Sequence, residues 1–177
     1  MLFRSGITRI EDRYGNILIE YYPRQKEILS EETAFMMTDL MQTVVDRGTG
    51  GSIRWKYNYY HPAAGKTGTT QGWTDAWFVG FSTQIAAGAW FGVDDPQVSL
   101  GKGADGTRAA LPAWARFMKT AHDSLYYTKE EFQQPEKVKP FSICQVSKEK
   151  PTPLCPLEKE LFILGTDPSR QCKIHRR

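Results

Sequence analysis

The sequence predicts an α/β (α+β) domain in which an antiparallel sheet packs with helices, followed by an irregular C-terminal tail. Three segments rich in apolar, aromatic or β-branched residues have the length and composition of strands: 63–70, 75–82 and 84–93. A short turn near Ser82 and Thr83 indicates that the last two pair antiparallel. Two longer segments repeat apolar residues at helical spacing, at 31–47 and 110–121.

The composition changes after residue 123. Six of the ten prolines lie between Pro135 and Pro168, among many charges. We therefore expect a folded domain over 1–123 and a proline- and charge-rich appendage over 124–177. The net charge of +3 also arises in the appendage, which has 10 Lys and Arg against 7 Asp and Glu. This excess is too small and too mixed to indicate a nucleic-acid partner.

The length and the apolar fraction suit one folded domain with a core. The chain has 177 residues, of which 40% are hydrophobic. No apolar run approaches the length of a membrane span, and the first four residues do not resemble a signal peptide.

The N-terminal elements carry their own start and stop signals. Residues 7–21 predict a hairpin that turns at Tyr14-Gly15-Asn16. Ser30 suits the N-cap of the 31–47 helix, and Gly48 suits its end. The following loop, 48–60, is rich in glycine and then in aromatic residues, and it could be a packed surface loop or one wall of a cleft.

The stretch from Ala63 to Thr70, A-A-G-K-T-G-T-T, concentrates the chemistry. Lys66 can pair with a carboxylate, and in an extended segment Thr67 and Thr69 point to the same side. Gly68 between them lets another backbone approach. Such a strand edge suits an extended peptide ending in a carboxylate. A plain strand with a solvent-facing lysine fits nearly as well.

A phosphate-binding loop, G-x-x-x-x-G-K-[ST], is a rival interpretation of this stretch. It requires glycine at position 60, where the chain has Tyr60, and a helix starting at the lysine, where Gly68 and Gly72 follow. The phosphate interpretation is therefore disfavoured.

The wider context resembles class A penicillin-binding proteins of the 1A type. The similar segments are R-G-T-G at 47–50, K-T-G-T at 66–69, T-D-A-W-F-V-G-F at 74–81 and A-W-F-G-V-D-D at 89–95. The resemblance runs from about Ile7 to His122, with a weaker similarity continuing to His175. It implies a partial penicillin-binding/β-lactamase-like transpeptidase fold, and the chain is similar to the last part of that domain.

This resemblance implies a serine-type D-alanyl-D-alanine transpeptidase or carboxypeptidase that cross-links peptidoglycan and is acylated by β-lactams. Lys66 would supply positive potential near the serine and the substrate carboxylate. Thr67 and Thr69 would hydrogen-bond that carboxylate, Gly68 would let the substrate backbone lie against the strand, and the Thr69 backbone N–H would be an oxyanion donor. Lys66 and Thr69 are therefore the catalytic candidates. No cofactor and no metal are implied.

Family members place an S-x-x-K motif with the nucleophile, then S-x-N, before K-T-G. Here S-x-x-K occurs at Ser99 in a glycine-rich loop and at Ser147 in the charged tail, and S-x-N occurs nowhere. We expect the nucleophile and its lysine to lie upstream of Met1, so that this chain alone is inactive. His61, His122 and His175 match no hydrolase motif.

The implied partners are peptidoglycan stem peptides, β-lactams and the N-terminal part of the same protein. Such proteins are anchored by an N-terminal span and work outside the cytoplasmic membrane. The competing functional class is a non-catalytic module that binds a peptide carboxylate or has a structural role, and the missing nucleophile–base pair is the feature that favours it.

The tail contains Cys144, Cys155, Cys172 and His175. These are zinc-ligand types, but the C-x10-C and C-x2-H spacings match no compact zinc knuckle. For an extracytoplasmic protein we expect one disulfide and one free thiol, with Cys144–Cys155 as the pair nearest in sequence.

Overall fold

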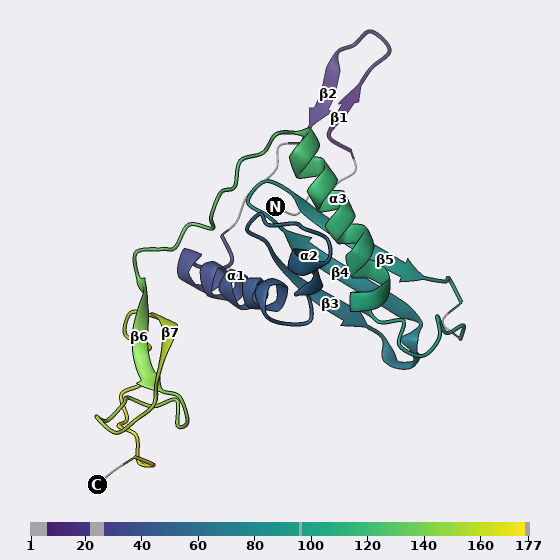
Figure 1. Cartoon of the computed structure of the whole chain (residues 1–177). Coiled ribbons are helices and arrows are strands. Elements are labelled where there is room, and N and C mark those ends of the chain that lie inside the picture. The colour runs from purple at the N-terminus through teal and green to yellow at the C-terminus, as the bar shows by residue number, and fades with distance from the viewer. Residues whose placement is uncertain (1–6, 22–26, 96, 176–177) are drawn as a thin grey trace. The chain divides into compact units, whose positions relative to one another are not determined.

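The computed structural model describes residues 7–21, 27–95 and 97–175. The chain divides into two compact units, residues 1–30 and 31–177. The first contains an antiparallel hairpin of β1 (Arg9–Glu11) and β2 (Ile17–Glu20). Gly15 has a φ of 84° at its turn, and the Asp12 carboxylate accepts hydrogen bonds from the backbone of Tyr14 and Asn16. The expected hairpin is therefore present (Figure 1).

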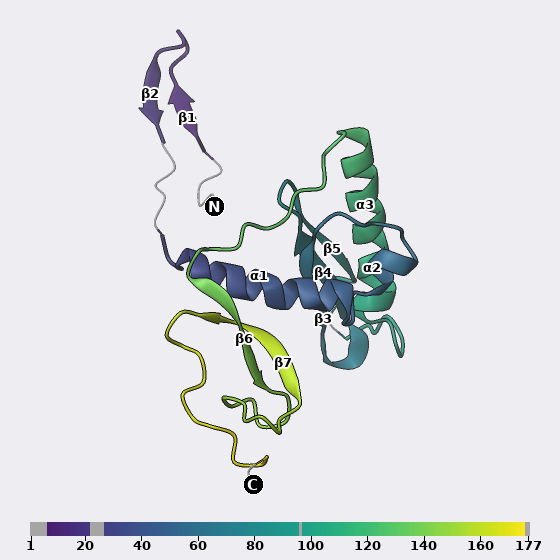
Figure 2. The same ribbon diagram turned by 60° about the vertical axis from the view of Figure 1, so that its left-hand side comes forward.

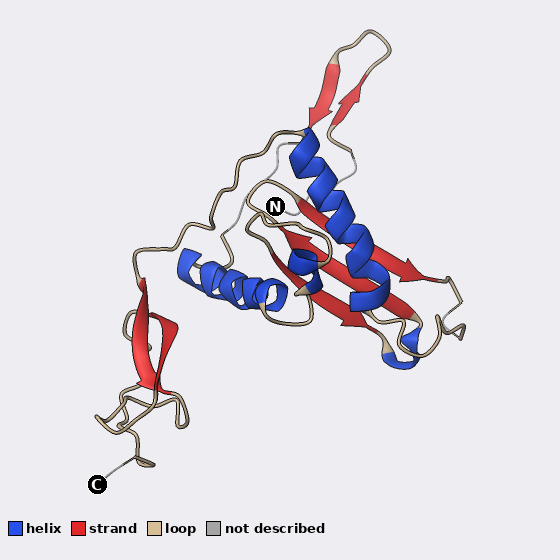
Figure 3. Ribbon diagram, viewed as in Figure 1, coloured by secondary structure: helices blue, strands red, loops and turns tan. Residues whose placement is uncertain are grey.

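The second unit is built on a three-stranded antiparallel sheet in the order β3-β4-β5 (Figures 1 and 3). The strands are β3 (Ala64–Thr69), β4 (Asp75–Phe81) and β5 (Ala86–Gly92). Each lies within the segment predicted for it and is shorter by one or more residues. The antiparallel order was also predicted correctly, and no helix begins at Lys66, so the phosphate-loop geometry is absent.

Helices α1 (Glu31–Asp46) and α3 (Leu111–Ser124) are the two predicted from helical spacing. A short helix, α2 (Ser52–Trp55), lies in the aromatic loop that was expected to be irregular. Figure 2 shows α3 along one face of the sheet, and α1 running beside the sheet near β3. Before α3 the backbone forms a single wider helical turn, Gly106–Ala110, whose start is capped by the Asp105 side chain.

The core of this unit lies between the sheet and α3. Phe78 of β4 and Trp114 of α3 are buried with ring centroids 4.8 Å apart. Trp114 also donates its indole N–H to the Ala87 carbonyl at 3.0 Å, which satisfies its one polar group. Val45, Ile53 and Tyr59 extend the same cluster towards α1 and α2. Burying aromatic side chains of this size stabilises the sheet–helix packing.

The tail after α3 contains a second hairpin that the composition did not predict. Strands β6 (Val138–Cys144) and β7 (Leu157–Ile163) pair antiparallel from Val138–Ile163 to Cys144–Leu157. Proline and charge content argued against strands here, yet Pro140 lies within β6. Each strand of a two-stranded sheet has one unpaired edge, where a missing backbone N–H is tolerated. Among the described residues, no helix is both long and apolar enough to cross a membrane.

Replacing Gly106 by alanine is expected to lower the melting temperature of the chain. A Cβ there would lie 2.3 Å from the Trp77 carbonyl oxygen and 2.8 Å from that of Gly68. Both are backbone atoms of the sheet, so relief requires moving a strand, and overpacking of this kind costs about 1–3 kcal/mol. Gly88→Ala is the control, because its Cβ would meet only a Val79 methyl at 3.7 Å. Equal melting temperatures by circular dichroism would contradict this account.

Candidate functional site

The K-T-G-T motif lies on β3, which is an edge strand of the described sheet. Six residue pairs join it to β4, from Ala64–Phe81 to Thr69–Ala76. Thr70 continues the register by donating its N–H to the Asp75 carbonyl at 3.1 Å. Because hydrogen-bonded and non-bonded residues alternate along an antiparallel pair, the backbones of Gly68 and Lys66 also face β4. The Thr67 and Thr69 N–H groups therefore point to the open edge.

Lys66 is exposed, and none of the ion pairs formed by the described residues includes it. Its ammonium instead donates to the Thr67 carbonyl oxygen at 3.0 Å and approaches the Thr67 hydroxyl at 3.4 Å. The lysine thus lies along its own strand edge with no carboxylate neutralising it. This arrangement leaves a positive charge available to an anionic ligand.

The two motif threonines are joined to loops that sequence analysis did not assign to the site. The Thr67 hydroxyl lies 3.3 Å from that of Thr49, and the Thr107 hydroxyl donates to the Thr49 carbonyl at 3.4 Å. The Thr69 hydroxyl accepts the Gly106 N–H at 3.0 Å. Four threonines from three segments therefore surround the edge of β3. Thr49 stands in R-G-T-G, a segment already noted for its resemblance, whereas no local pattern marked Thr107.

Asp75 has a structural role at the start of a strand. It opens β4, and its carboxylate accepts the Trp90 indole N–H at 2.8 Å and the Thr74 hydroxyl at 3.2 Å. One carboxylate oxygen therefore ties β4 to β5, and the other binds the residue that precedes β4.

Neither S-x-x-K serine is placed as a nucleophile beside Lys66. The Ser99 hydroxyl donates to the Gly72 carbonyl at 2.6 Å and accepts the Gly101 N–H at 3.1 Å, which fastens its loop to the turn before β4. Ser147 lies in the tail, where its hydroxyl accepts the Glu149 N–H at 3.3 Å. Both hydroxyls therefore form structural hydrogen bonds away from Lys66.

A serine–histidine pair does occur, inside the core. The buried His122 ring lies 3.0 Å from the Ser82 hydroxyl through Nε2 and 2.8 Å from the Met118 carbonyl through Nδ1. The Met118 carbonyl can only accept a hydrogen bond, so Nδ1 carries a proton in this contact. Ser82 also accepts the N–H groups of Gln84 and Ile85, which closes the β4–β5 turn. With both side chains buried, this pair holds the turn in shape.

The loop of residues 48–60 contributes both to the core and to the site. Tyr59 is buried, and its ring contacts those of His61 and His122 at centroid distances of 5.6 and 5.3 Å. Burial raises the pKa of Tyr59 to about 12 and lowers that of His61.

A separate hollow of about 480 Å³ lies between the first half of α1 and residues 132–135, and no nucleophile–base pair lines it.

The cysteines do not form the expected Cys144–Cys155 disulfide, because all three are free thiols. Nearness in sequence misled here, since Cys172 and His175 approach Cys144 from the other end of the tail. A hydrogen bond from the Ser147 side chain, with others from the backbone and ring of His175, lowers the pKa of Cys172 to about 5 against the opposing effect of burial.

Two family models match this chain. Residues 7–118 match the family model of the penicillin-binding protein transpeptidase domain, and residues 134–177 match that of the penicillin-binding protein 1A C-terminal domain. Penicillin-binding protein 1A of Aquifex aeolicus is 35% identical over 166 residues, covering 94% of this chain and 22% of the relative. That of Clostridium tetani is 32% identical over 173 residues, covering 94% and 21%.

The solved structures agree in fold. The crystal structure of penicillin-binding protein 1A from Haemophilus influenzae matches with a TM-score of 0.73 and 25% identity, over 94% of this chain and 30% of that one. The chain thus spans about a fifth of the length of the curated relatives quoted above. The family model covers well over half of the chain and includes the whole sheet with its K-T-G-T strand. This chain therefore belongs to the penicillin-binding protein transpeptidase family, of the 1A type.

Proposed function

We propose that this chain supplies the substrate-carboxylate and oxyanion part of a peptidoglycan D-alanyl-D-alanine transpeptidase. The observation that carries the proposal is the K-T-G-T motif on an open strand edge, with an exposed and unneutralised Lys66. Membership of a transpeptidase family makes acyl transfer the chemistry to test.

In this reaction a serine oxygen attacks the carbonyl carbon of the penultimate D-alanine. The tetrahedral intermediate collapses with cleavage of the C–N bond, and the terminal D-alanine leaves as the amine. An amine of a second stem peptide then takes the acyl group and releases the serine. A β-lactam undergoes the first step by ring opening. The serine and its lysine would come from sequence outside this chain, and the protein would work outside the cytoplasmic membrane.

The roles follow from where each group points. The Lys66 ammonium and the Thr67 hydroxyl lie together at the strand edge. There the ammonium could exchange its hydrogen bond to the Thr67 carbonyl oxygen for one to a substrate's terminal carboxylate. The outward N–H of Thr69 is available to a developing oxyanion, and one such donor contributes about 3 kcal/mol of barrier lowering. Gly68 offers no side chain to obstruct a peptide lying against β3.

The rest of the transpeptidase domain is the proposed partner of the sheet face that carries Lys66. Paired residues share a face, so Lys66 and Gly68 lie on the side of Val79 and Trp77, and Trp77 is paired with Trp90. These three apolar side chains are 54%, 44% and 43% exposed. Contiguous apolar surface of this kind is typical of a contact with another segment.

The chain alone is expected to resist acylation. Its S-x-x-K hydroxyls hold their own loops, and no S-x-N occurs in the sequence. Intact-mass spectrometry after incubation with a penicillin should show no adduct. A stoichiometric adduct on Ser99 or Ser147 would show that the nucleophile lies in this chain and would refute the proposed division of the site.

The contribution of Lys66 to the acylation rate can be measured in a chimaera. This chimaera carries the present chain in place of the matching segment of the Aquifex aeolicus relative. Lys66→Ala should slow acylation by a fluorescent penicillin roughly 10²–10³-fold, because a charge facing the forming oxyanion is removed. Lys66→Arg should rescue only partly, since a guanidinium is wider and planar.

The matched control for this experiment is Lys102→Ala, which also removes an exposed charge and tests the S-x-x-K match at Ser99. It should leave the rate unchanged. Melting temperatures are measured in parallel, and an exposed lysine without an ion pair should contribute little to stability. The proposed role of β3 would be contradicted if the Lys66→Ala chimaera is acylated at the wild-type rate, or if it loses activity only because it unfolds.

Thr69→Val is expected to affect both acylation and stability in the same chimaera. The hydroxyl's expected role in binding the carboxylate predicts that its removal weakens recognition more than it alters stability. The structure adds that the Thr69 hydroxyl accepts the Gly106 N–H, so valine leaves a partly buried donor unpaired at a cost of about 1–3 kcal/mol. Thr69→Ser keeps the acceptor and should retain the melting temperature. If valine and serine variants melt alike, the Gly106 hydrogen bond is unimportant.

A further inference from the structure

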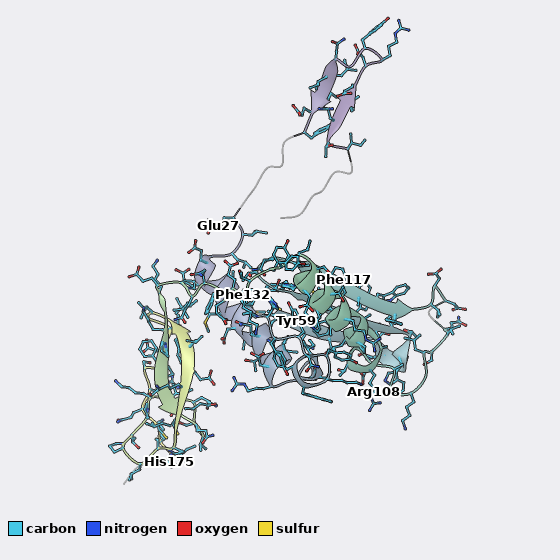
Figure 4. The ribbon with its side chains drawn as sticks, turned by 45° about the horizontal axis from the view of Figure 1, so that its top comes forward. Glu27, Tyr59, Arg108, Phe117, Phe132 and His175 are labelled. Carbon is cyan, nitrogen blue, oxygen red and sulfur yellow. The ribbon has the colours of Figure 1, made fainter. Side chains whose placement is uncertain are left out.

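A second cluster of reactive side chains lies at one end of the β6–β7 hairpin, outside the strand site. Cys144 ends β6, Cys155 precedes β7, and Cys172 and His175 follow β7. Figure 4 labels His175 at this end of the hairpin. The three sulfur atoms and a ring nitrogen all lie within 4.8 Å of one another. Four side chains from three separate segments thus converge on one point.

The separations among Cys144, Cys172 and His175 are close to those of a tetrahedral metal site. Sγ of Cys144 and Cys172 are 3.6 Å apart, and His175 Nδ1 lies 3.4 and 3.5 Å from them. An ion about 2.3 Å from sulfur and about 2.05 Å from nitrogen, at tetrahedral angles, separates sulfurs by about 3.8 Å and sulfur from nitrogen by about 3.6 Å. Each of these three distances is within about 0.2 Å of that ideal, and Cys155 Sγ lies within 4.8 Å of the other three ligand atoms.

The surrounding backbone supports charged sulfur atoms. The Ser147 N–H points to Cys144 Sγ at 3.5 Å, and the Thr152 N–H points to Cys155 Sγ at 3.2 Å. Amide donors of this kind spread the charge of metal-bound thiolates and fix their orientation. The Thr152 hydroxyl also donates to the His175 carbonyl at 2.7 Å, which holds the histidine segment against the cysteine turn.

This end of the tail also has little apolar core of its own. The buried hydrophobic residues described after residue 134 are Val138, Ile143 and two of the cysteines themselves. The main core cluster among the described residues draws its members from Val45 to Met118 and includes none of them. A segment of this size with so small a core usually needs a disulfide or a metal to hold its loops.

We propose that Cys144, Cys155, Cys172 and His175 bind one structural Zn²⁺ ion. Three sulfurs and one imidazole form a closed four-ligand set that leaves no position for a catalytic water. Thiolate with imidazole in tetrahedral geometry favours zinc over calcium, magnesium or manganese, which prefer oxygen ligands. The ion joins the end of β6 to the turn before β7 and to the segment after it.

The competing arrangement is a disulfide between Cys144 and Cys172. It requires the sulfurs to close from 3.6 Å to about 2.05 Å, and it gives no role to the converging Cys155 and His175. The two arrangements differ in the number of thiols, because zinc keeps all three unoxidised whereas a disulfide removes two.

The test is metal analysis of the 177-residue chain produced with zinc in the medium and purified without chelators. Plasma mass spectrometry should find one zinc per chain. Intact mass under denaturing, non-reducing conditions should correspond to three free thiols. Replacing zinc by cobalt(II) should give the visible absorption of a tetrahedral thiolate site. A chain without bound metal, or with a mass lower by two hydrogen atoms, overturns the proposal.

Variants localise the metal within the tail. Cys172→Ser and His175→Ala should lose the bound zinc or the cobalt spectrum. Gln171→Ala is the matched control, since its exposed side chain lies in the same segment and has no ligand atom in the cluster. Cys155→Ser removes the one partly exposed cysteine and serves as a second test if Cys172→Ser fails to fold. Full zinc content in any ligand variant contradicts the assignment.

Chelation tests the structural role. After zinc removal, amide hydrogen exchange should accelerate in β6 and β7 and stay unchanged in β4, whose packing depends on α3. Unchanged protection of β6 would show that the cluster does not hold the hairpin.

Discussion

Along β3, each side chain lies opposite one partner on β4, from Ala64 beside Phe81 to Thr69 beside Ala76. Because side chains alternate between faces, this single register decides what every motif residue does. It sends the backbone of Lys66 and Gly68 towards β4 and leaves the N–H groups of Thr67 and Thr69 on the open side. A slip of one residue would exchange the two sets and remove both the lysine and the oxyanion donor from their proposed positions.

That register is maintained by contacts that are not local in sequence. The turn at Gly106 sits against β3 and β4 with no space for a Cβ, and its N–H is bound by the Thr69 hydroxyl. Asp75 ties the start of β4 to Trp90 on β5. The contact between Phe78 of β4 and Trp114 of α3 then packs the sheet against that helix. Stability and the candidate chemistry therefore share the same residues at the end of β3, which explains why Thr69 serves both.

The sequence was sufficient wherever a pattern is local. Helical spacing identified α1 and α3, and the K-T-G-T stretch identified β3, because hydrophobic periodicity and motif spacing are properties of one segment. The hairpin of β6 and β7 escaped prediction because Pro140 and the charged residues mask its alternation. Thr49 and Thr107 could not be derived as site residues, since each depends on segments meeting in space. The three tail cysteines and His175 were identified as zinc-ligand types, but their spacing argued against a compact site, and their convergence could not be derived from sequence. Cys144 and His175, for example, are 31 positions apart.

An edge strand with an unpaired row of amides and carbonyls has a further physical consequence. It is a template on which a second copy of the same strand could add by backbone hydrogen bonding, and proteins commonly prevent this with a charged side chain. On β3 the exposed ammonium of Lys66 has that property, because two copies aligned edge to edge would bring like charges together. Under the proposed function, the same edge would still accept a strand that ends in a carboxylate. The charge of the incoming strand would thus decide whether the β3 edge pairs with it: a second copy of β3 brings a positive charge and is repelled, whereas a peptide that ends in a carboxylate is attracted.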